Sequence, residues 1–253
     1  MDEEVLAGGN SSTIVRVGDT VHRPAGLWTP AVHQLLTTLR AAGVTEVPEP
    51  FGLDEQGREV LSYLPGIVGN YPMPSWIWSP TILHEAGSLL RRVHDADAPL
   101  AHRAATWQLP AHEPIEVVCL NDVAPYNMVF QDGHITGLID VDMASPGPRI
   151  WDLAYLAYRL VPLGEYTDHD VPGEDARPGR LDALIRSYGY DFDQAAVLRT
   201  AADRMEDLAI FTDQRAADTG RNDFVEHAAL YRRDRARLLE MSASLSLRVL
   251  KTL

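Results

Sequence analysis

The sequence predicts an α+β fold of two lobes, a small β-rich lobe followed by a larger, mostly helical one. Three observations support this prediction. Alternating apolar and polar residues, which are typical of strands, gather in residues 1–65. A segment rich in proline, glycine and tryptophan follows at 66–80, and from about residue 148 apolar residues recur at helical spacing. We therefore expect lobes at 1–65 and 81–253, joined by a hinge at 66–80.

The first lobe is expected to contain a β-hairpin, a helix and a further strand. Residues 13–17 and the run TVHRP both alternate, and Gly18-Asp19 between them is a typical turn. Residues 59–64, EVLSYL, form the later strand and end at Pro65-Gly66. Between them, residues 29–42 place four apolar residues on one helical face: Val32, Leu35, Leu36 and Leu39.

The second lobe is expected to open with a helix after Ser79-Pro80, since proline is favoured in a first helical turn. Short strands with polar loops follow, from about residue 115 to residue 140. The last helices are predicted at residues 182–188, 193–218 and 223–249, after a break at 164–179. Two lobes suit an enzyme that closes over a small ligand.

The charge balance limits the partners. The 253 residues include 22 Lys or Arg and 36 Asp or Glu, a net charge of −14. Nucleic acids and anionic membranes bind basic surfaces, so we expect neither as a partner. The negative charge permits a cationic small molecule, although it also serves solubility alone.

Cysteine usage and the first residues indicate a soluble cytoplasmic protein. The single cysteine, Cys119, excludes an internal disulfide framework and a multi-cysteine metal site. The acidic start MDEEVLAGGNSS has no apolar core, so it does not resemble a signal peptide. No run approaches the roughly 18 apolar residues that a membrane span needs.

The most informative segment is LNDVAPYN, residues 120–127. Asp122 and Asn127 lie on one loop, and Asp140 ends the later strand-like run GLID. Phosphoryl transfer from ATP needs a carboxylate to orient the attacking hydroxyl and oxygen ligands to hold Mg²⁺ on the phosphates. Protein kinases place these groups as D-x₄-N followed by an Asp after a strand pair, and the spacing here is the same.

An Asp-x₄-Asn pair also arises by chance in loops, where both residue types favour turns. The flanking apolar runs VVCL, MVF and GLI favour the functional interpretation, because they would place both loops at strand ends.

These motifs resemble the aminoglycoside phosphotransferase family, also called the choline-kinase-like phosphotransferase family. The resemblance rests on LNDVAPYNMVF, on GLIDVDMASPGPRIWDLAYLAYRLVPL and, less specifically, on LAGGNSSTIVRVGDTVHRPAG and GREVLSYLPG. It implies a protein-kinase-like fold and ATP- or GTP-dependent phosphorylation of a hydroxyl group on a small molecule. It also implies that Asp122 is the catalytic base and that Asn127 and Asp140 are Mg²⁺ ligands. For Asp142 we favour a solvated position over one lining the phosphate site.

The resemblance assigns nucleotide contacts in the first lobe. Gly8 and Gly9 occupy the place of a loop that covers the nucleotide, and Arg23 that of the basic residue that pairs with its phosphates. The family expects a glutamate on the following helix to hold that base, but this helix offers Val32 and His33, so the ion pair is absent or rebuilt. His33 itself could meet phosphate or be a surface residue.

The segment of Ser62, Tyr63 and Leu64 resembles the hinge whose backbone meets the adenine edge. A buried strand followed by a turn is the simpler interpretation and is compatible with it.

The resemblance departs from the family at Leu120, where relatives have a histidine that orients the catalytic loop. A nucleotide-binding pseudokinase with a regulatory or partner-binding role is therefore an alternative. A kinase for a non-antibiotic metabolite is another. The acceptor is expected to be an aminoglycoside or another cationic amino sugar if the five carboxylates between Glu165 and Asp175 line its pocket, but they also suit a solvated loop.

Overall fold

The computed structural model describes residues 3–6, 14–165 and 170–252, with side chains as far as residue 245. The chain divides into two compact units. The first comprises residues 1–69 with 91–149, and the second comprises residues 70–90 with 150–253.

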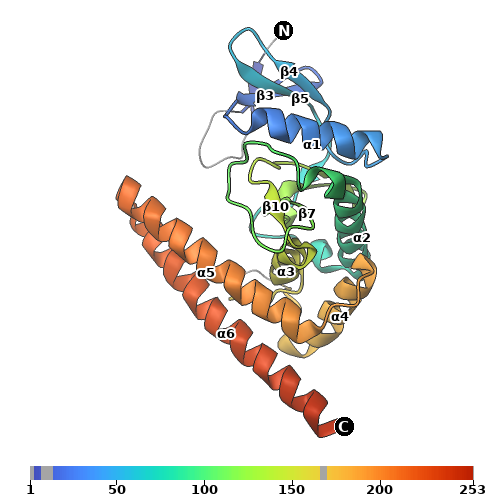
Figure 1. Cartoon of the computed structure of the whole chain (residues 1–253), viewed down its shortest axis with the longest axis vertical. Helices are drawn as coiled ribbons and strands as arrows, with labels where there is room; N and C mark the ends of the chain where they lie inside the picture. The colour runs from blue at the N-terminus through green and yellow to red at the C-terminus, as the bar shows by residue number, and fades with distance from the viewer. Residues whose placement is uncertain (1–2, 7–13, 166–169, 253) are drawn as a thin grey trace. The chain divides into compact units, whose positions relative to one another are not determined.

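A five-stranded antiparallel sheet forms the N-terminal part of the first unit, with the order β1-β2-β3-β5-β4 (Figure 1). The predicted hairpin is confirmed as β2 and β3, and Gly18 in its turn has a φ of 60°, which glycine adopts without strain. The strands are β1 (Glu3–Val5), β2 (Val15–Val17), β3 (Thr20–Pro24), β4 (Pro50–Leu53) and β5 (Arg58–Ser62).

Helix α1 (Thr29–Ala41) packs against this sheet, in contact with β4 and, through the hydrogen bond from His33 to Glu59, with β5 (Figure 1). Its predicted apolar face is confirmed, because four of its side chains are fully buried: Val32, Leu35, Leu36 and Leu39. Burial of this face holds the helix against the sheet.

The rest of the first unit carries two small sheets, in which β7 pairs with β10 and β8 pairs with both β6 and β9. The predicted short strands with polar loops are therefore confirmed. The elements are β6 (Ile67–Val68), η2 (Ala98–Leu100), β7 (Val117–Cys119), η3 (Pro125–Asn127), β8 (Met128–Gln131), β9 (His134–Leu138) and β10 (Ser145–Gly147). Helix α2 (Pro80–Asp97) begins at the predicted proline, within the second unit, and continues into the first.

The described part of the second unit is helical, and α5 and α6 run side by side along much of their length (Figure 1). Helix α4 begins at Arg177 rather than at residue 182, because Pro178 occupies its first turn and extends it backwards. The elements are η1 (Ser75–Trp78), α3 (Arg149–Leu160), η4 (Glu174–Ala176), α4 (Arg177–Tyr188), α5 (Gln194–Thr219) and α6 (Asn222–Thr252). None of the described helices has a stretch long and apolar enough to cross a bilayer.

Candidate active site

The loop between β7 and β8 holds the predicted base in a fixed orientation. The Nδ2 atom of Asn127 donates hydrogen bonds to the main-chain oxygen and to Oδ2 of Asp122, both at 2.9 Å. The Tyr126 hydroxyl donates to Oδ1 of the same carboxylate at 2.6 Å. Pro125 begins the short η3 turn that brings Tyr126 and Asn127 back towards Asp122. Both oxygens of the Asp122 carboxylate are thus held by residues of its own loop.

The strand pair β8–β9 places Asp140 beside Asn127. Met128 faces Leu138 in the register of this pair, and the main-chain N–H of Ile139 donates to the oxygen of Asn127 at 2.8 Å. Partial desolvation by the surrounding protein raises the pKa of Asp140 above the ordinary value, although 57 % of the side chain is exposed. Arg23 opposes that shift, whereas Asp142 and Asp122 add to it.

The chemistry of these side chains fits a divalent cation on a nucleotide. Asn127 commits its amide nitrogen to Asp122, so its carbonyl oxygen is the atom that would face a cation. Among the described residues, no group of three or more His, Cys, Asp or Glu side chains could by itself hold a metal. Mg²⁺ needs no such group, because it usually binds one or two carboxylates together with substrate phosphates and water.

Arg23 reaches the same place from strand β3. Its Nη1 atom donates to Oδ1 of Asp140 at 3.2 Å, and its Nη2 atom pairs with Asp142. The expectation that Asp142 is solvated is therefore wrong. Its side chain is only 22 % exposed because the guanidinium draws it inwards. Burial raises the pKa of Asp142, and the positive charge of Arg23 partly offsets this.

The expected glutamate is absent from α1, and the ion pair is rebuilt with Glu59 of β5. Arg23 Nε donates to Oε2 of Glu59 at 2.5 Å, and His33 Nε2 donates to Oε1 at 2.9 Å. His33 is thus not a plain surface residue, since its Nε2 atom is hydrogen-bonded to Glu59; a contact with phosphate stays a prediction. Sequence reasoning missed Glu59, although strand alternation could have found it had the pairing of β3 with β5 been known.

Asn121 is a second residue that sequence reasoning missed. Its side chain is buried, and Nδ2 donates to the Met143 oxygen and to the Ser145 hydroxyl, both at 2.8 Å. It therefore ties the loop of Asp122 to the segment that follows Asp140. Leu120, where the family resemblance predicts a histidine, is only 2 % exposed and packs in the core.

The remaining predicted nucleotide contacts are less defined. Gly8 and Gly9 lie outside the described residues. The main-chain N–H of Ser62 donates to the Glu49 oxygen, and that of Tyr63 donates to the Asp19 oxygen, both at 2.8 Å. Adenine recognition at Ser62, Tyr63 and Leu64 stays a prediction, and those two N–H groups are already used within the sheet.

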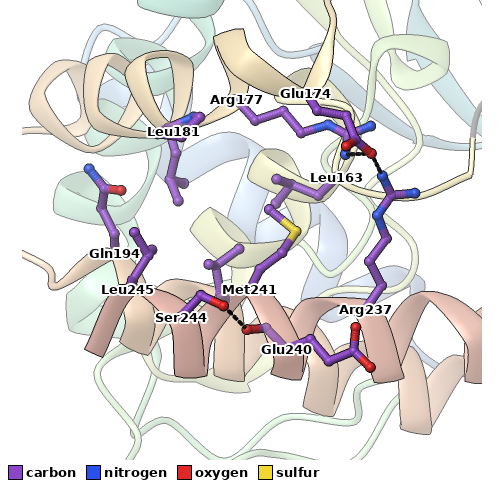
Figure 2. A pocket seen from close by; sticks show the side chains of 12 residues that line it. Leu163, Glu174, Arg177, Leu181, Gln194, Arg237, Glu240, Met241, Ser244 and Leu245 are labelled. Atoms are coloured by element: carbon purple, nitrogen blue, oxygen red, sulfur yellow. Dashed lines mark hydrogen bonds and ion pairs between the residues drawn. The ribbon is translucent and has the colours of Figure 1, made fainter. Parts of the chain in front are cut away.

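Two of the four described carboxylates in the acidic segment of the second unit pair with arginine. Glu165 pairs with Arg233 at 3.1 Å, and Glu174 pairs with Arg177 at 3.0 Å and with Arg237. Figure 2 shows the Glu174 cluster at the edge of an open pocket of about 380 Å³ between α4, α5 and α6. Asp168 lies outside the described residues. The segment thus gives no support for a carboxylate-rich pocket that would select a cation.

The comparisons with known proteins concern the family and the fold. Residues 103–198, which include Asp122, Asn127 and Asp140, match the family model described as the phosphotransferase enzyme family. The predicted family resemblance is confirmed. A trifolitoxin immunity protein of Rhizobium leguminosarum bv. trifolii is 36 % identical over 152 residues. That alignment spans 57 % of this chain and 57 % of that protein, so the chain matches little more than half of its curated relative.

Solved structures confirm the protein-kinase-like α+β fold. A choline/ethanolamine kinase family protein from Mesorhizobium loti superposes with a TM-score of 0.63 at 18 % sequence identity. The superposition covers 95 % of this chain and 88 % of the chain of that protein. An amicoumacin kinase in complex with AMP-PNP and Ca²⁺ superposes with a TM-score of 0.65 at 14 % identity, covering 94 % and 88 %. At these identities the likeness establishes the fold of this chain.

Proposed function

We propose that this protein transfers the γ-phosphoryl group of ATP or GTP to a hydroxyl group of a small molecule, in a reaction that requires Mg²⁺. The observation that carries the proposal is the convergence of Asp122, Asn127, Asp140 and Arg23 within one compact unit. The family match over residues 103–198 supports it, as does the kinase-like fold.

Each residue then has a role in the transfer. Asp122 orients the acceptor hydroxyl and takes its proton while the acceptor oxygen bonds to the γ-phosphorus and the nucleoside diphosphate leaves. Asn127 and Asp140 would hold the cation, which neutralises phosphate charge when bound. Arg23, already placed beside Asp140, would pair with the phosphates, since a guanidinium can donate two parallel hydrogen bonds to them.

For the acceptor we propose a hydroxylated antimicrobial compound. The curated relative is named as a trifolitoxin immunity protein, and one of the similar solved structures is named as an amicoumacin kinase. Because Glu165 and Glu174 pair with arginine, these two carboxylates do not favour a polycationic acceptor over a neutral one.

The test combines nucleotide binding with turnover. Calorimetry should show that AMP-PNP binds with Mg²⁺ and that Asp140→Ala abolishes the dependence on the metal. In a screen of hydroxylated antimicrobials, Asp122→Asn should keep nucleotide affinity and lower turnover by about 10²- to 10⁴-fold.

Asp132→Asn is the matched control, because Asp132 lies in the exposed turn between β8 and β9, outside the site. It should leave both measurements unchanged. Nucleotide binding without turnover on any acceptor would favour the pseudokinase alternative, whereas binding that ignores both Mg²⁺ and Asp140→Ala would refute the phosphotransferase proposal.

A further inference from the structure

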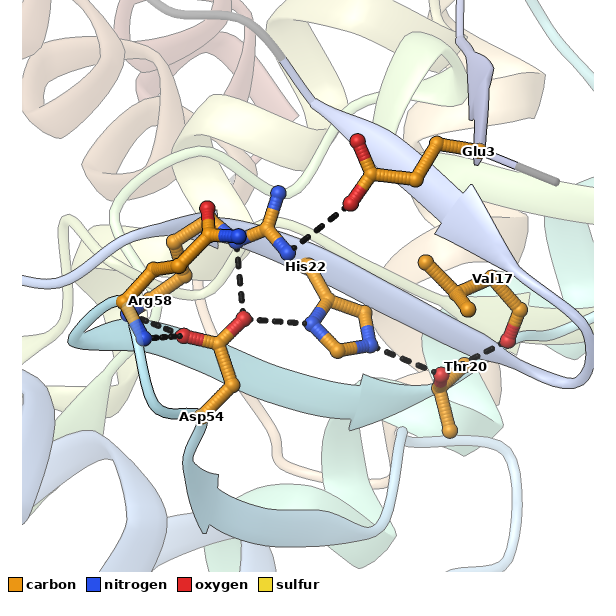
Figure 3. A network of polar contacts seen from close by, with 7 residues as sticks. Glu3, Val17, Thr20, His22, Asp54 and Arg58 are labelled. Carbon is orange, nitrogen blue, oxygen red and sulfur yellow. Dashed lines mark hydrogen bonds and ion pairs between the residues drawn. The ribbon is translucent and has the colours of Figure 1, made fainter. Parts of the chain in front are cut away.

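Two clusters of histidine, carboxylate and arginine lie on the N-terminal sheet, one on each face. His22 and Arg23 are consecutive in β3, so their side chains point to opposite faces. His22 joins Asp54 and Arg58, whose side chains form the network in Figure 3. Arg23 joins Glu59 and His33 on the face that meets α1.

The α1-facing cluster is the more buried of the two. The Glu59 side chain is 1 % exposed, against 15 % for Asp54. A carboxylate at that depth is stable only if its charge is paired and both oxygens are hydrogen-bonded. Arg23 meets Oε2 of Glu59 and His33 meets Oε1, so both oxygens are used.

Glu59 fixes the orientation of the Arg23 guanidinium. Nε faces Glu59, which leaves Nη1 and Nη2 directed at Asp140 and Asp142. Arg23 and Glu59 are direct partners in the register of β3 and β5. Strand pairing itself therefore brings the carboxylate to the arginine, and α1 contributes an imidazole rather than a carboxylate.

We propose that Glu59, braced by His33, is the positioning residue for the phosphate-binding Arg23. Glu59 touches no substrate and acts through the guanidinium that it orients. This inference rests on the proposed function for its nucleotide effect. It goes beyond that function because it assigns the carboxylate that orients Arg23 to strand β5 rather than to helix α1. The placement of Arg23 then follows from the register of two strands.

The test compares Glu59→Gln with Asp54→Asn, since each neutralises a carboxylate of the same sheet in the same kind of cluster. Glu59→Gln should weaken Mg·AMP-PNP binding about tenfold or more, because a charge-assisted hydrogen bond is lost. Asp54→Asn should change that affinity by less than about twofold. Melting curves establish that both variants are folded.

His33 offers a milder perturbation if Glu59→Gln fails to fold. His33→Gln keeps a donor for the Glu59 carboxylate, whereas His33→Leu removes it. Affinity for Mg·AMP-PNP should fall with leucine and return towards the parent value with glutamine. Equal affinities for the parent and His33→Leu would count against the brace.

A nucleotide-independent measurement separates this inference from the proposed function. The measurement is the rate at which the Arg23 Nε–H proton exchanges with solvent, followed by its NMR signal, which is assigned by its loss in Arg23→Lys. This proton should exchange slowly in the parent and in Asp54→Asn. It should exchange fast in Glu59→Gln. If the parent binds no nucleotide, the proposed function fails and this signal alone decides the positioning. Unaltered exchange in folded Glu59→Gln, or an affinity equal to that of Asp54→Asn, would overturn the inference.

Discussion

Replacing Asn121 by alanine should destabilise the protein markedly, because this side chain links two loops of the candidate active site. Its Nδ2 atom donates to the Met143 oxygen and the Ser145 hydroxyl, both at 2.8 Å, and only 3 % of the residue is exposed. Removing the amide leaves the part-buried Met143 oxygen and the buried Ser145 hydroxyl without that donor, at about 1 kcal/mol each. Asn121 also has a φ of 65°, where alanine costs about 1 kcal/mol more than asparagine.

The expected loss is therefore about 3 kcal/mol in the free energy of unfolding, which for a chain of this size corresponds to a fall in Tm of about 6–12 °C. Chemical and thermal unfolding followed by circular dichroism would measure it. Asn121→Gly is the matched control, because glycine accepts the positive φ and loses only the hydrogen bonds. The free energy of unfolding of Asn121→Gly should be about 1 kcal/mol higher than that of the alanine variant. If both variants melt within about 1 °C of the parent, the hydrogen bonds of the Asn121 side chain do not stabilise the protein and the reasoning fails.

Two further predictions concern other parts of the first unit. Leu120→His should lower stability by about 1–3 kcal/mol, because the site is buried and apolar; a stable variant with higher turnover would instead show that the family histidine can be restored. Hydrogen bonding from His22 and Arg58 holds the pKa of Asp54 well below its ordinary value, so its contribution to stability is present above about pH 4 and is lost as pH falls through the lowered pKa. The stability difference between the parent and Asp54→Asn should thus shrink in acid, and a difference that does not change with pH in urea titrations would contradict this.

The parts of the fold that sequence predicted well depend on short-range patterns. The apolar spacing in α1 and the turn at Gly18 report local geometry, so their elements are confirmed. The motif around Asp122 was accessible for a similar reason, since its chemistry requires a fixed spacing along one loop. The roles of Asp122, Asn127 and Asp140 stay predictions, although the structure brings all three into one unit.

The residues that sequence missed depend on long-range pairing. Glu59 meets Arg23 only through the register of two strands that are separated by a helix and a further strand. Asn121 acts through partners on a segment beyond β8 and β9. The solvated position expected for Asp142 was wrong because nothing local to it indicates an arginine from β3. Such contacts have no signature in a single sequence, because they depend on how distant elements pack.

The pairing of β3 with β5 also determines where the chain tolerates changes in length. The side-chain period of a strand is two, so a shift of one residue moves every side chain to the opposite face. A single-residue insertion early in β3 would place His22, rather than Arg23, towards α1. Insertions of any parity in the loop between β4 and β5 would leave the orientation of Arg23 intact, because the register of β3 with β5 lies outside that loop, although they would disturb the hydrogen bonds of Asp54. A library of insertion variants should therefore show a sharp boundary at the strand ends. Inside a strand, the protein should tolerate an insertion according to whether its number of residues is even or odd. In the loops, only the length of the insertion should matter.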